Sequence, residues 1–272
     1  MAFIRKQQSN GKTYFYLVEK IKGHKYKILE SYGTNPPVKY KPKLIKGFAE
    51  QELKKIPDES VNLIIIDPPY GIEFDTNFRN EKSETIGEIS LDNEKIFETF
   101  PEVIRECYRI LKNDSALYCF SRWDVTHRFI AILQKYFKIK NRLNWVKNNW
   151  SMGDLKGSYA MQCEDVIFAV KGRHILNEGR NTDYLNYPRV SNQTLLHSHQ
   201  KPKELLDFLI KKSSNRDDTV LDCYIGSGST IISAVNLGRK SIGIELNDKY
   251  LDITNLRLEK ECYKKIKGIE WR

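Results

Sequence analysis

Four consecutive residues, Asp67-Pro68-Pro69-Tyr70, carry groups that suit the binding of a planar ring with an amino substituent. The two prolines fix the backbone φ angle and remove two N–H donors, which leaves the carbonyls of Asp67 and Pro68 free to accept hydrogen bonds. The Asp67 carboxylate adds an acceptor, and Tyr70 adds a flat aromatic surface. An amine N–H can point at these acceptors while its ring stacks on the tyrosine. The alternative is an ordinary turn that ends a strand, with the tyrosine as core filling.

A second group of residues suits the binding of a nucleoside. In the segment VLDCYIGSGST, residues 220–230, an apolar run is followed by Gly226 and Gly228 and then by a helical pattern. Such a loop lets a ligand approach the backbone and places it at a helix N-terminus. Glu245 ends the next apolar run, about 20 residues after the glycines, where a carboxylate can bind ribose hydroxyls. The pattern indicates an adenosine-type cofactor; an ordinary glycine-rich helix start is the alternative.

Both groups lie where strands end in a predicted alternation of strands and helices. The apolar run 61–66, VNLIII, predicts a buried parallel strand that stops at Asp67. Apolar periodicity predicts further strands over residues 115–120, 164–170, 219–223 and 240–245. Helices are predicted over residues 96–111 and 125–136. A third helix begins at Pro202, a fourth follows the glycines and ends at Leu237, and a fifth runs from a cap at Asn247 to about 266. The alternation predicts an α/β fold with a doubly wound, mainly parallel sheet, in which ligands bind beyond the carboxyl ends of the strands.

Three other segments depart from this pattern. Residues 13–20 and 24–32 are rich in aromatic and β-branched residues and predict a small β-hairpin. A basic connector, Lys39–Lys43, follows it, so we divide the chain into a hairpin appendage with linker, 1–43, and a main domain, 44–272. Residues 73–94 are polar and predict a functional loop. Residues 172–198 have weak periodicity and predict an inserted loop region.

Composition limits the class of protein. The chain has 272 residues and a formal net charge of +10. A basic excess of this kind indicates a polyanionic partner, and a merely soluble basic protein is the alternative. The sequence contains no apolar run of bilayer-spanning length, and its N-terminus lacks the apolar core of a signal peptide, so we expect a cytoplasmic protein without membrane partners.

The cysteines do not indicate a metal site or a disulfide framework. They number five, and no pair has the spacing of metal ligands. The histidines near 197–199 have no partner cysteines at zinc spacing. The sequence therefore predicts reduced thiols and no bound metal.

Together, these residues resemble the N6-adenine and N4-cytosine DNA amino-methyltransferases. The resemblance is closer to their β group, in which a catalytic Asp-Pro-Pro-Tyr precedes the cofactor loop, as 67–70 precedes 222–230 here. Methyltransferases that act on RNA guanine amines or protein glutamine usually have the reverse order. The resemblance extends from about 44 to 262, outside the N-terminal 43 residues. It includes the stretches PDESVNLIIIDPPYGI, ECYRILKND, HSHQKPKELL and GIELNDKYLDI.

The resemblance implies a fold of the S-adenosylmethionine-dependent methyltransferase type and a function. S-adenosylmethionine would be the cofactor, and the substrate would be a base flipped out of double-stranded DNA. The residues implied to be catalytic are Asp67, Pro68, Pro69 and Tyr70. The residues implied to bind the cofactor are Asp222, Tyr224, Gly226, Ser227, Gly228, Glu245 and Lys201. Lys201 would meet the methionine carboxylate, with a solvated lysine at a helix start as the alternative.

Contacts to DNA are predicted for the 172–198 region, as a compact target-recognition element. Arg173, Arg180 and Arg189 lie in it, and arginine suits contacts to phosphates and base edges. A variable surface loop is the alternative. A homodimer and a cognate restriction endonuclease as a partner stay open.

The target atom is the remaining question. Aspartate at 67 favours the N6 amine of adenine, because the cytosine enzymes of the family more often carry serine there. N4-cytosine methylation is the alternative, and a catalytically silent DNA-binding protein on the same fold is another. Two departures from the family pattern are Asp222-Cys223-Tyr224, where the family usually has Asp-Pro-Phe, and His197-Ser198-His199, where it has His-Pro-Thr.

Overall fold

The structure is a computed structural model of the whole chain. It describes residues 2–9, 12–20, 26–33, 40–70, 95–150, 156–190 and 200–263. The predicted 73–94 loop lies outside the described residues, as do His197, Ser198 and His199.

A mainly parallel sheet forms the centre of the molecule. Within the described residues it has eight strands in the order β4-β11-β10-β5-β6-β8-β7-β9. Neighbours from β4 to β6 are parallel, whereas β8 runs antiparallel to both β6 and β7. The strands are β4 (Lys43–Lys46), β5 (Val61–Ile66), β6 (Leu111–Ser121), β7 (Lys138–Val146), β8 (Cys163–Lys171), β9 (Tyr184–Asn186), β10 (Thr219–Asp222) and β11 (Lys240–Glu245).

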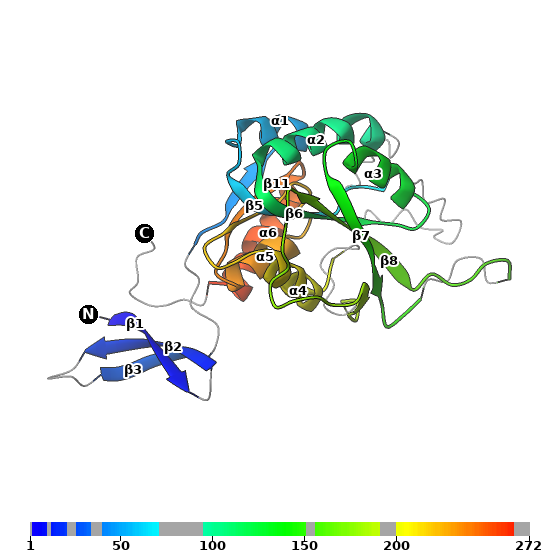
Figure 1. Ribbon diagram of the computed structural model, residues 1–272. Helices are drawn as coiled ribbons and strands as arrows, with labels where there is room; N and C mark the ends of the chain where they lie inside the picture. Colours follow the sequence, from blue (N-terminus) through cyan, green and yellow to red (C-terminus); the bar gives the residue numbers. More distant parts are fainter. Residues whose placement is uncertain are drawn as a thin grey trace.

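Helices cover both faces of this sheet (Figure 1). One face carries α1 (Ala49–Glu52), the 3-10 helix η1 (Leu53–Lys55), α2 (Ile96–Ile110) and α3 (Thr126–Leu133). The other face carries α4 (Lys203–Ser213), α5 (Ser229–Asn236) and α6 (Asp248–Glu261). The predicted doubly wound α/β architecture is therefore confirmed.

The side chains of β5 alternate between the two covered faces of the sheet, which explains why its sequence is a continuous apolar run. Leu63 and Ile65 pack with α4 on one face, while Ile64 and Ile66 pack with α2 on the other. Successive strand residues point to opposite faces, so a strand covered on both sides needs apolar residues at every position. The run ends at Asp67 because the chain leaves the sheet there.

The N-terminal segment has one more strand than predicted. Three antiparallel strands, β1 (Ala2–Ser9), β2 (Lys12–Lys20) and β3 (Tyr26–Gly33), form a separate sheet in the described residues. The predicted hairpin corresponds to β2 and β3. The first strand was missed because its sequence, AFIRKQQS, is mostly polar after Arg5.

Three strands of the main sheet were also missed. β4 lies where a basic connector was predicted to end, and β9 lies inside the predicted 172–198 insert. Both are short, with lysines bounding β4, so neither gives a clear period of two. β7 does carry a signal, since Leu143 and Trp145 alternate with polar residues.

The helices begin close to the predicted residues, but α3 ends at Leu133 rather than 136 and α6 ends at Glu261 rather than about 266. Pro202 was predicted to begin α4, but it has extended backbone angles and occupies the N-cap position, so this helix begins at Lys203. The Asn247 side chain accepts a hydrogen bond from the Lys249 amide and caps α6, as predicted. In the described residues, no helix is long and apolar enough to cross a membrane.

Candidate active site

Three acidic residues lie at the carboxyl ends of three adjacent parallel strands. Asp67 follows β5, Asp222 ends β10, and Glu245 ends β11. The register aligns the strands, with Leu221 opposite Ile64 and Asp222 opposite Gly243. The two predicted groups of functional residues, far apart in sequence, therefore meet at one edge of the sheet.

Both carboxylate oxygens of Asp67 accept hydrogen bonds from protein groups. The Tyr70 hydroxyl donates to Oδ1 at 2.7 Å. The Lys201 ammonium donates to Oδ2 at 2.5 Å across 134 residues of sequence. Each oxygen keeps a second lone pair, but the Lys201 ammonium neutralises the carboxylate and thereby weakens it as an acceptor for a substrate amine.

Lys201 is a buried cation with two acidic neighbours. Its side chain is 7% exposed, and its Nζ lies 2.5 Å from Asp67 and 3.3 Å from Glu164. It also lies 4.9 Å from the ring centre of Phe120 and 6.0 Å from that of Trp145. Burial lowers the pKa of Lys201, but the carboxylates of Asp67 and Glu164 outweigh it and raise that pKa overall.

The structure thus gives Lys201 a protein partner where the sequence predicted a cofactor carboxylate. A solvated lysine, the alternative interpretation, is wrong because the side chain is buried. Its assignment to the cofactor stays a prediction.

Glu164 is a member of this site that the sequence analysis did not single out. It lies at the start of β8, and its carboxylate pairs with Lys147 at the end of β7 as well as with Lys201. Burial raises the pKa of Glu164, but the two lysines outweigh it and lower that pKa. The sequence did indicate that Glu164 has a partner. This residue begins the apolar run 164–170, and an acid on a buried strand needs a positively charged or hydrogen-bonding partner.

The Asp67–Tyr70 turn is partly buried. Pro68 is buried and Tyr70 is half-buried. The Tyr70 ring meets Phe129 edge-on at 6.5 Å, so one side of the ring belongs to the core. Burial, followed by the nearby Asp67 carboxylate, raises the pKa of Tyr70 well above its usual value. The phenol therefore stays protonated and can donate to Asp67.

Asp222 is a buried carboxyl group in an acidic neighbourhood. It is 3% exposed, and its Oδ1 accepts the Tyr224 amide at 3.0 Å. Burial raises the pKa of Asp222 to about 7, and the negative charges of Asp67 and Glu245 add to the shift. A cation beside these carboxylates would stabilise the negative charges that burial has removed from water. This edge of the sheet therefore suits a positively charged ligand.

Glu245 organises the turn after β10. Its Oε2 accepts the Gly226 amide at 2.9 Å, and its Oε1 accepts the Asn247 amide at 2.9 Å. Burial raises the pKa of Glu245. Each oxygen keeps a second lone pair, so hydroxyl donors can still bind.

The glycine loop is shaped by packing against α6. Gly226 and Gly228 have φ angles of +49° and +80°, and Gly228 caps α5. A Cβ at Gly228 would lie 2.5 Å from Thr254 Cγ2. The Ser227 carbonyl accepts from the buried Arg257 at 2.7 Å. Position 228 therefore requires glycine because Thr254 of the protein itself leaves no room for a Cβ.

Comparison with known proteins identifies the family. A family model described as DNA methylase matches residues 61–256, a span that runs from β5 into α6 and contains both groups of site residues. The chain belongs to this family, the N6-adenine and N4-cytosine DNA methylases. The expected family is thereby confirmed.

Individual relatives agree with this assignment. The methylase is similar to the DNA adenine methyltransferase YhdJ of Escherichia coli (strain K12), with 33% identity over 251 residues that cover 79% of this chain and 82% of that protein. Its fold is similar to that of M1.HpyAVI in complex with SAM, with a TM-score of 0.62 and 24% identity over 80% of this chain and 99% of that chain. It is also similar to the PvuII DNA methyltransferase, described as cytosine-N4-specific, with a TM-score of 0.63 and 17% identity over 85% of this chain and 91% of that chain.

The three arginines predicted to contact DNA do not lie at one edge of the methylase sheet. Arg173 follows β8, and its amide donates to Asp114 near the start of β6, at the end of the sheet away from Asp67. Arg180 follows Gly179, whose carbonyl accepts from Lys212 near the end of α4. Arg189 lies after β9, where its amide donates to Asn148 at 3.1 Å, beyond the carboxyl end of β7.

Arg173 and Arg180 thus lie at the edge opposite Asp67, and Arg189 at the same edge as Asp67. The prediction of a single recognition element from 172 to 198 needs correction in this respect. The segment reaches the edge that carries Asp67 through β9, whose three residues pair in parallel with the last three residues of β7.

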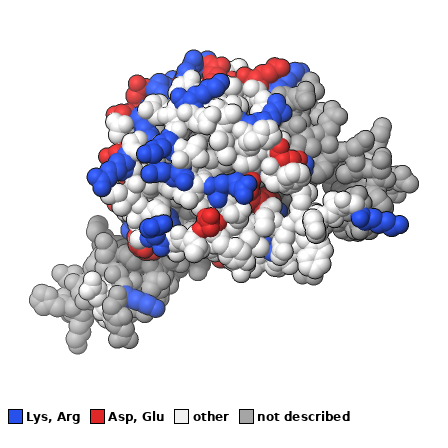
Figure 2. All heavy atoms as spheres, turned by 45° about the vertical axis from the view of Figure 1, so that its right-hand side comes forward, with Lys and Arg blue, Asp and Glu red and all other residues white. Residues whose placement is uncertain are grey.

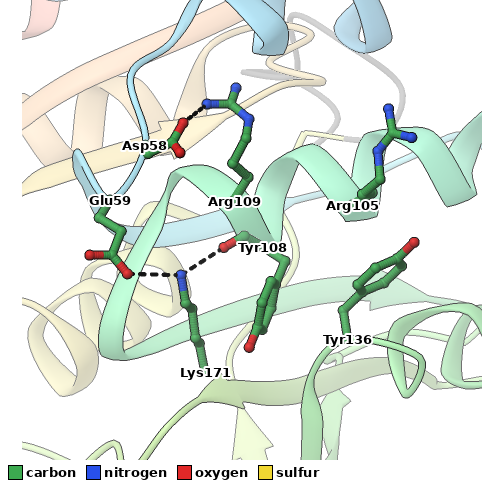
Figure 3. A pocket seen from close by; sticks show the side chains of 7 residues that line it. All are labelled: Asp58, Glu59, Arg105, Tyr108, Arg109, Tyr136 and Lys171. Carbon is green, nitrogen blue, oxygen red and sulfur yellow. Dashed lines mark hydrogen bonds and ion pairs between the residues drawn. The ribbon is translucent and has the colours of Figure 1, made fainter.

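A cavity of about 530 Å³ lies at the edge opposite Asp67 (Figure 3). Its charged groups already have partners in the cavity or beside it: Arg109 pairs with Asp58 and Glu106, and Lys171 pairs with Glu59. Arg105 pairs with Glu102. Lys171 also donates to the Leu111 carbonyl at 2.7 Å. These contacts join α2, β6 and β8 at the end of the sheet away from the site, and they serve the fold.

Proposed function

We propose that this methylase transfers a methyl group from S-adenosylmethionine to the exocyclic N6 amine of adenine in double-stranded DNA. One observation carries the proposal. The Asp67-Pro68-Pro69-Tyr70 turn lies beside Asp222 and Glu245 at the carboxyl edge of adjacent strands. An amine acceptor and a nucleoside site thus meet where doubly wound folds bind ligands.

The residues of the turn have distinct roles in the proposal. The lone pair of an aromatic amine is delocalised into its ring, which makes the nitrogen a weak nucleophile. The Asp67 carboxylate and the Pro68 carbonyl accept the two amine N–H groups and draw the nitrogen toward tetrahedral geometry. Pro69 keeps the turn rigid. Positioning supplies much of the rate.

S-adenosylmethionine supplies an activated methyl group on a sulfonium. When bound, it would give up this methyl group to the amine nitrogen, and the electron pair of the broken carbon–sulfur bond would stay on sulfur. The amine proton then leaves to Asp67, directly or through water. The reaction needs no covalent bond to the protein.

The acidic edge of the sheet fits this cofactor. S-adenosylmethionine carries a positive sulfonium and a positive amino group, and Asp222 is a buried carboxyl group with two acidic neighbours. Glu245 binds the ribose hydroxyls with its remaining lone pairs. Tyr224, Gly226, Ser227 and Gly228 form the turn around the methionine end. Lys201 is adjacent through its contact with Asp67.

The base must leave the duplex to reach this turn, because a stacked base cannot contact both acceptors. Tyr70 then stacks on it with the face of its ring that does not meet Phe129. Lys and Arg side chains are spread over the face of the molecule shown in Figure 2, with acidic side chains among them. This basic surface suits contact with DNA phosphates.

Adenine is favoured over cytosine by the aspartate at position 67. The similarity to a protein named DNA adenine methyltransferase, at 33% identity, also supports adenine. N4-cytosine is the rival target, since the PvuII enzyme shares the fold. A DNA-binding protein without catalysis is the rival of another class.

Mass spectrometry of nucleosides from DNA treated with the protein and S-adenosylmethionine tests the proposal. N6-methyladenine is the expected product. N4-methylcytosine without N6-methyladenine would overturn the assignment of the base, and the absence of both products would overturn methyl transfer.

Asp67→Ala is the matched control. It should reduce the rate by about 100- to 10,000-fold, since it removes a positioned acceptor. The variant should stay folded and bind the cofactor, because Lys201 keeps Glu164 as its partner. Turnover close to that of the wild type in this variant would refute the role of Asp67.

Assembly and partners are separate questions. The chain is also similar to M.HinfI of Haemophilus influenzae, which is named a type II methyltransferase, with 28% identity. A cognate endonuclease for this chain and a homodimer are both testable, the first by cutting of unmethylated DNA with extracts of the source cells and the second by light scattering.

A further inference from the structure

The contacts of Asp67 raise a problem that the proposed reaction must solve. Each oxygen of Asp67 already accepts one hydrogen bond, from Tyr70 to Oδ1 at 2.7 Å and from Lys201 to Oδ2 at 2.5 Å, so a substrate amine must compete with a neutralising cation for the charge of Asp67. The ammonium is the stronger competitor, because it carries a full positive charge opposite the carboxylate, whereas the phenol is neutral.

Lys201 cannot leave Asp67 for water without a large loss of free energy. Its side chain is 7% exposed and lies among the rings of Phe120, Trp145 and Tyr70, with Nζ 4.9 to 6.0 Å from the ring centres. A buried cation needs a carboxylate partner. A second such partner must therefore be in reach when the first is needed for the substrate.

Glu164 provides that partner. Its Oε1 pairs with Lys147, whereas its Oε2 is buried and accepts no hydrogen bond from any residue that the structure describes. The distance from Lys201 Nζ to this oxygen is 3.3 Å. A shift of about half an ångström would bring it to ordinary ion-pair length.

We propose that Glu164 is a positioning residue that takes over the Lys201 ammonium from Asp67 when the target amine binds. The exchange keeps the charge of the site constant, because the cation passes between two carboxylates. It frees Asp67 Oδ2 to accept the amine N–H and, after transfer, the amine proton. This inference rests on the proposed function.

Glu164→Gln tests the proposal. The amide keeps the shape of the side chain but cannot neutralise the ammonium, so Lys201 stays on Asp67 and competes with the amine. We expect kcat near neutral pH to fall by about tenfold or more, with the Kd for S-adenosylmethionine changed less than about threefold. An unchanged kcat would overturn the proposal.

The pH profile separates this role from a structural one. Glu164→Gln removes one of the two carboxylates that raise the pKa of Lys201, and Asp67, with the Tyr70 phenol beside it, is the remaining acid. Lys201 should then lose its proton within the assay range, so kcat of the variant should rise from about pH 7 to about pH 10, while kcat of the wild type does not. Parallel profiles would contradict the proposal.

Lys147→Met is the matched control. It removes the other ion pair of Glu164, at the base of the β7–β8 hairpin, and leaves the carboxylate that Lys201 needs. Its pH profile should keep the shape of the wild-type profile. The alkaline rise in this variant would assign the effect to the hairpin, and the proposal would be wrong.

A measurement on the wild type covers the case in which the variants do not fold. In a crystal structure with a cofactor analogue and DNA containing the target base, Lys201 Nζ should lie closer to Glu164 than to Asp67. The opposite order would overturn the proposal. Failure of the wild-type protein to methylate any DNA would instead overturn the proposed function.

Discussion

The acidic residues of the site differ in their charge at neutral pH. Lys201 keeps Glu164 ionised, since the pKa of that carboxyl is lowered. Asp222 has no basic partner among the residues that the structure describes, and burial raises its pKa to about 7. The charge of Asp222 therefore changes near neutral pH.

Binding of S-adenosylmethionine should depend on pH through Asp222. A cation binds the ionised carboxylate, so the carboxyl group must release a proton when the free protein is below its pKa of about 7. Affinity should fall as the pH drops from about 8 to about 5, approaching tenfold per pH unit at the acidic end. Isothermal titration calorimetry in buffers of different ionisation enthalpy measures both the affinity and the proton release.

Asp222→Asn is the control for this prediction. The amide has no charge to regulate, so affinity should be lower and nearly independent of pH over the same range. A wild-type affinity that does not change between about pH 5 and about pH 8, on either side of the raised pKa of about 7, would show that Asp222 does not titrate with the cofactor.

The stability of the free protein should respond to the same group with the opposite sign. Between about pH 4 and about pH 7 folded Asp222 holds a proton that the unfolded chain has released. The free energy of unfolding should therefore fall as the pH rises through this window. Urea unfolding of wild type and Asp222→Asn at several pH values isolates this contribution.

The loop between β10 and α5 is fixed in place by contacts with α6 as well as by its own glycines. Gly228 begins α5 in the left-handed region, and Thr254 of α6 lies against it. Arg257, one helical turn further on, binds Ser227 and pairs with Glu261. The position of the loop therefore depends on the docking of α6.

Gly228→Ala should destabilise the protein by about 2–4 kcal/mol. The left-handed conformation costs an alanine about 1–2 kcal/mol, and overpacking against Thr254 adds about 1–2 kcal/mol. Chemical denaturation gives the change in the free energy of unfolding.

Gly179→Ala is the matched control. Gly179 has a φ of +73°, but a Cβ there would meet no atom within 4 Å. Its cost should be limited to about 1–2 kcal/mol. Equal losses for the two variants would mean that α6 yields to the extra methyl group.

At the scale of the whole molecule, the direction of each strand decides which surface faces the DNA. Arg173 and Arg180 are exposed at the edge opposite Asp67, whereas Arg189 lies beyond the carboxyl end of β7. A duplex that presents a base to Asp67 passes the carboxyl edge, so the three arginines cannot contribute alike.

Arg189→Ala should weaken DNA binding several-fold and lower the slope of log K against log salt by about one, as for the loss of one phosphate contact. Arg173→Ala should leave both quantities close to the wild-type values. Fluorescence anisotropy with labelled duplex at several salt concentrations measures them. A larger loss for Arg173→Ala than for Arg189→Ala would place the DNA on the other edge.

The sequence alone determined the helices, the central parallel strands and the main acids of the site, although β1, β4, β7 and β9 were missed. The run 61–66 ends at a rigid Asp-Pro-Pro turn, and β5 has these same bounds. Asp222 and Glu245 were placed at strand ends for the same reason. Periodicity, proline and glycine act over a few residues, so such features can be read locally.

Only the tertiary structure decided which charges meet. Lys201 reaches Asp67 across 134 residues, and Glu164 joins them from β8, an antiparallel strand whose place in the sheet no local pattern encodes. The opposite placement of Arg173 and Arg189 has the same origin. Partners at a strand end depend on the order and direction of the neighbouring strands, and long-range packing of the whole chain sets both.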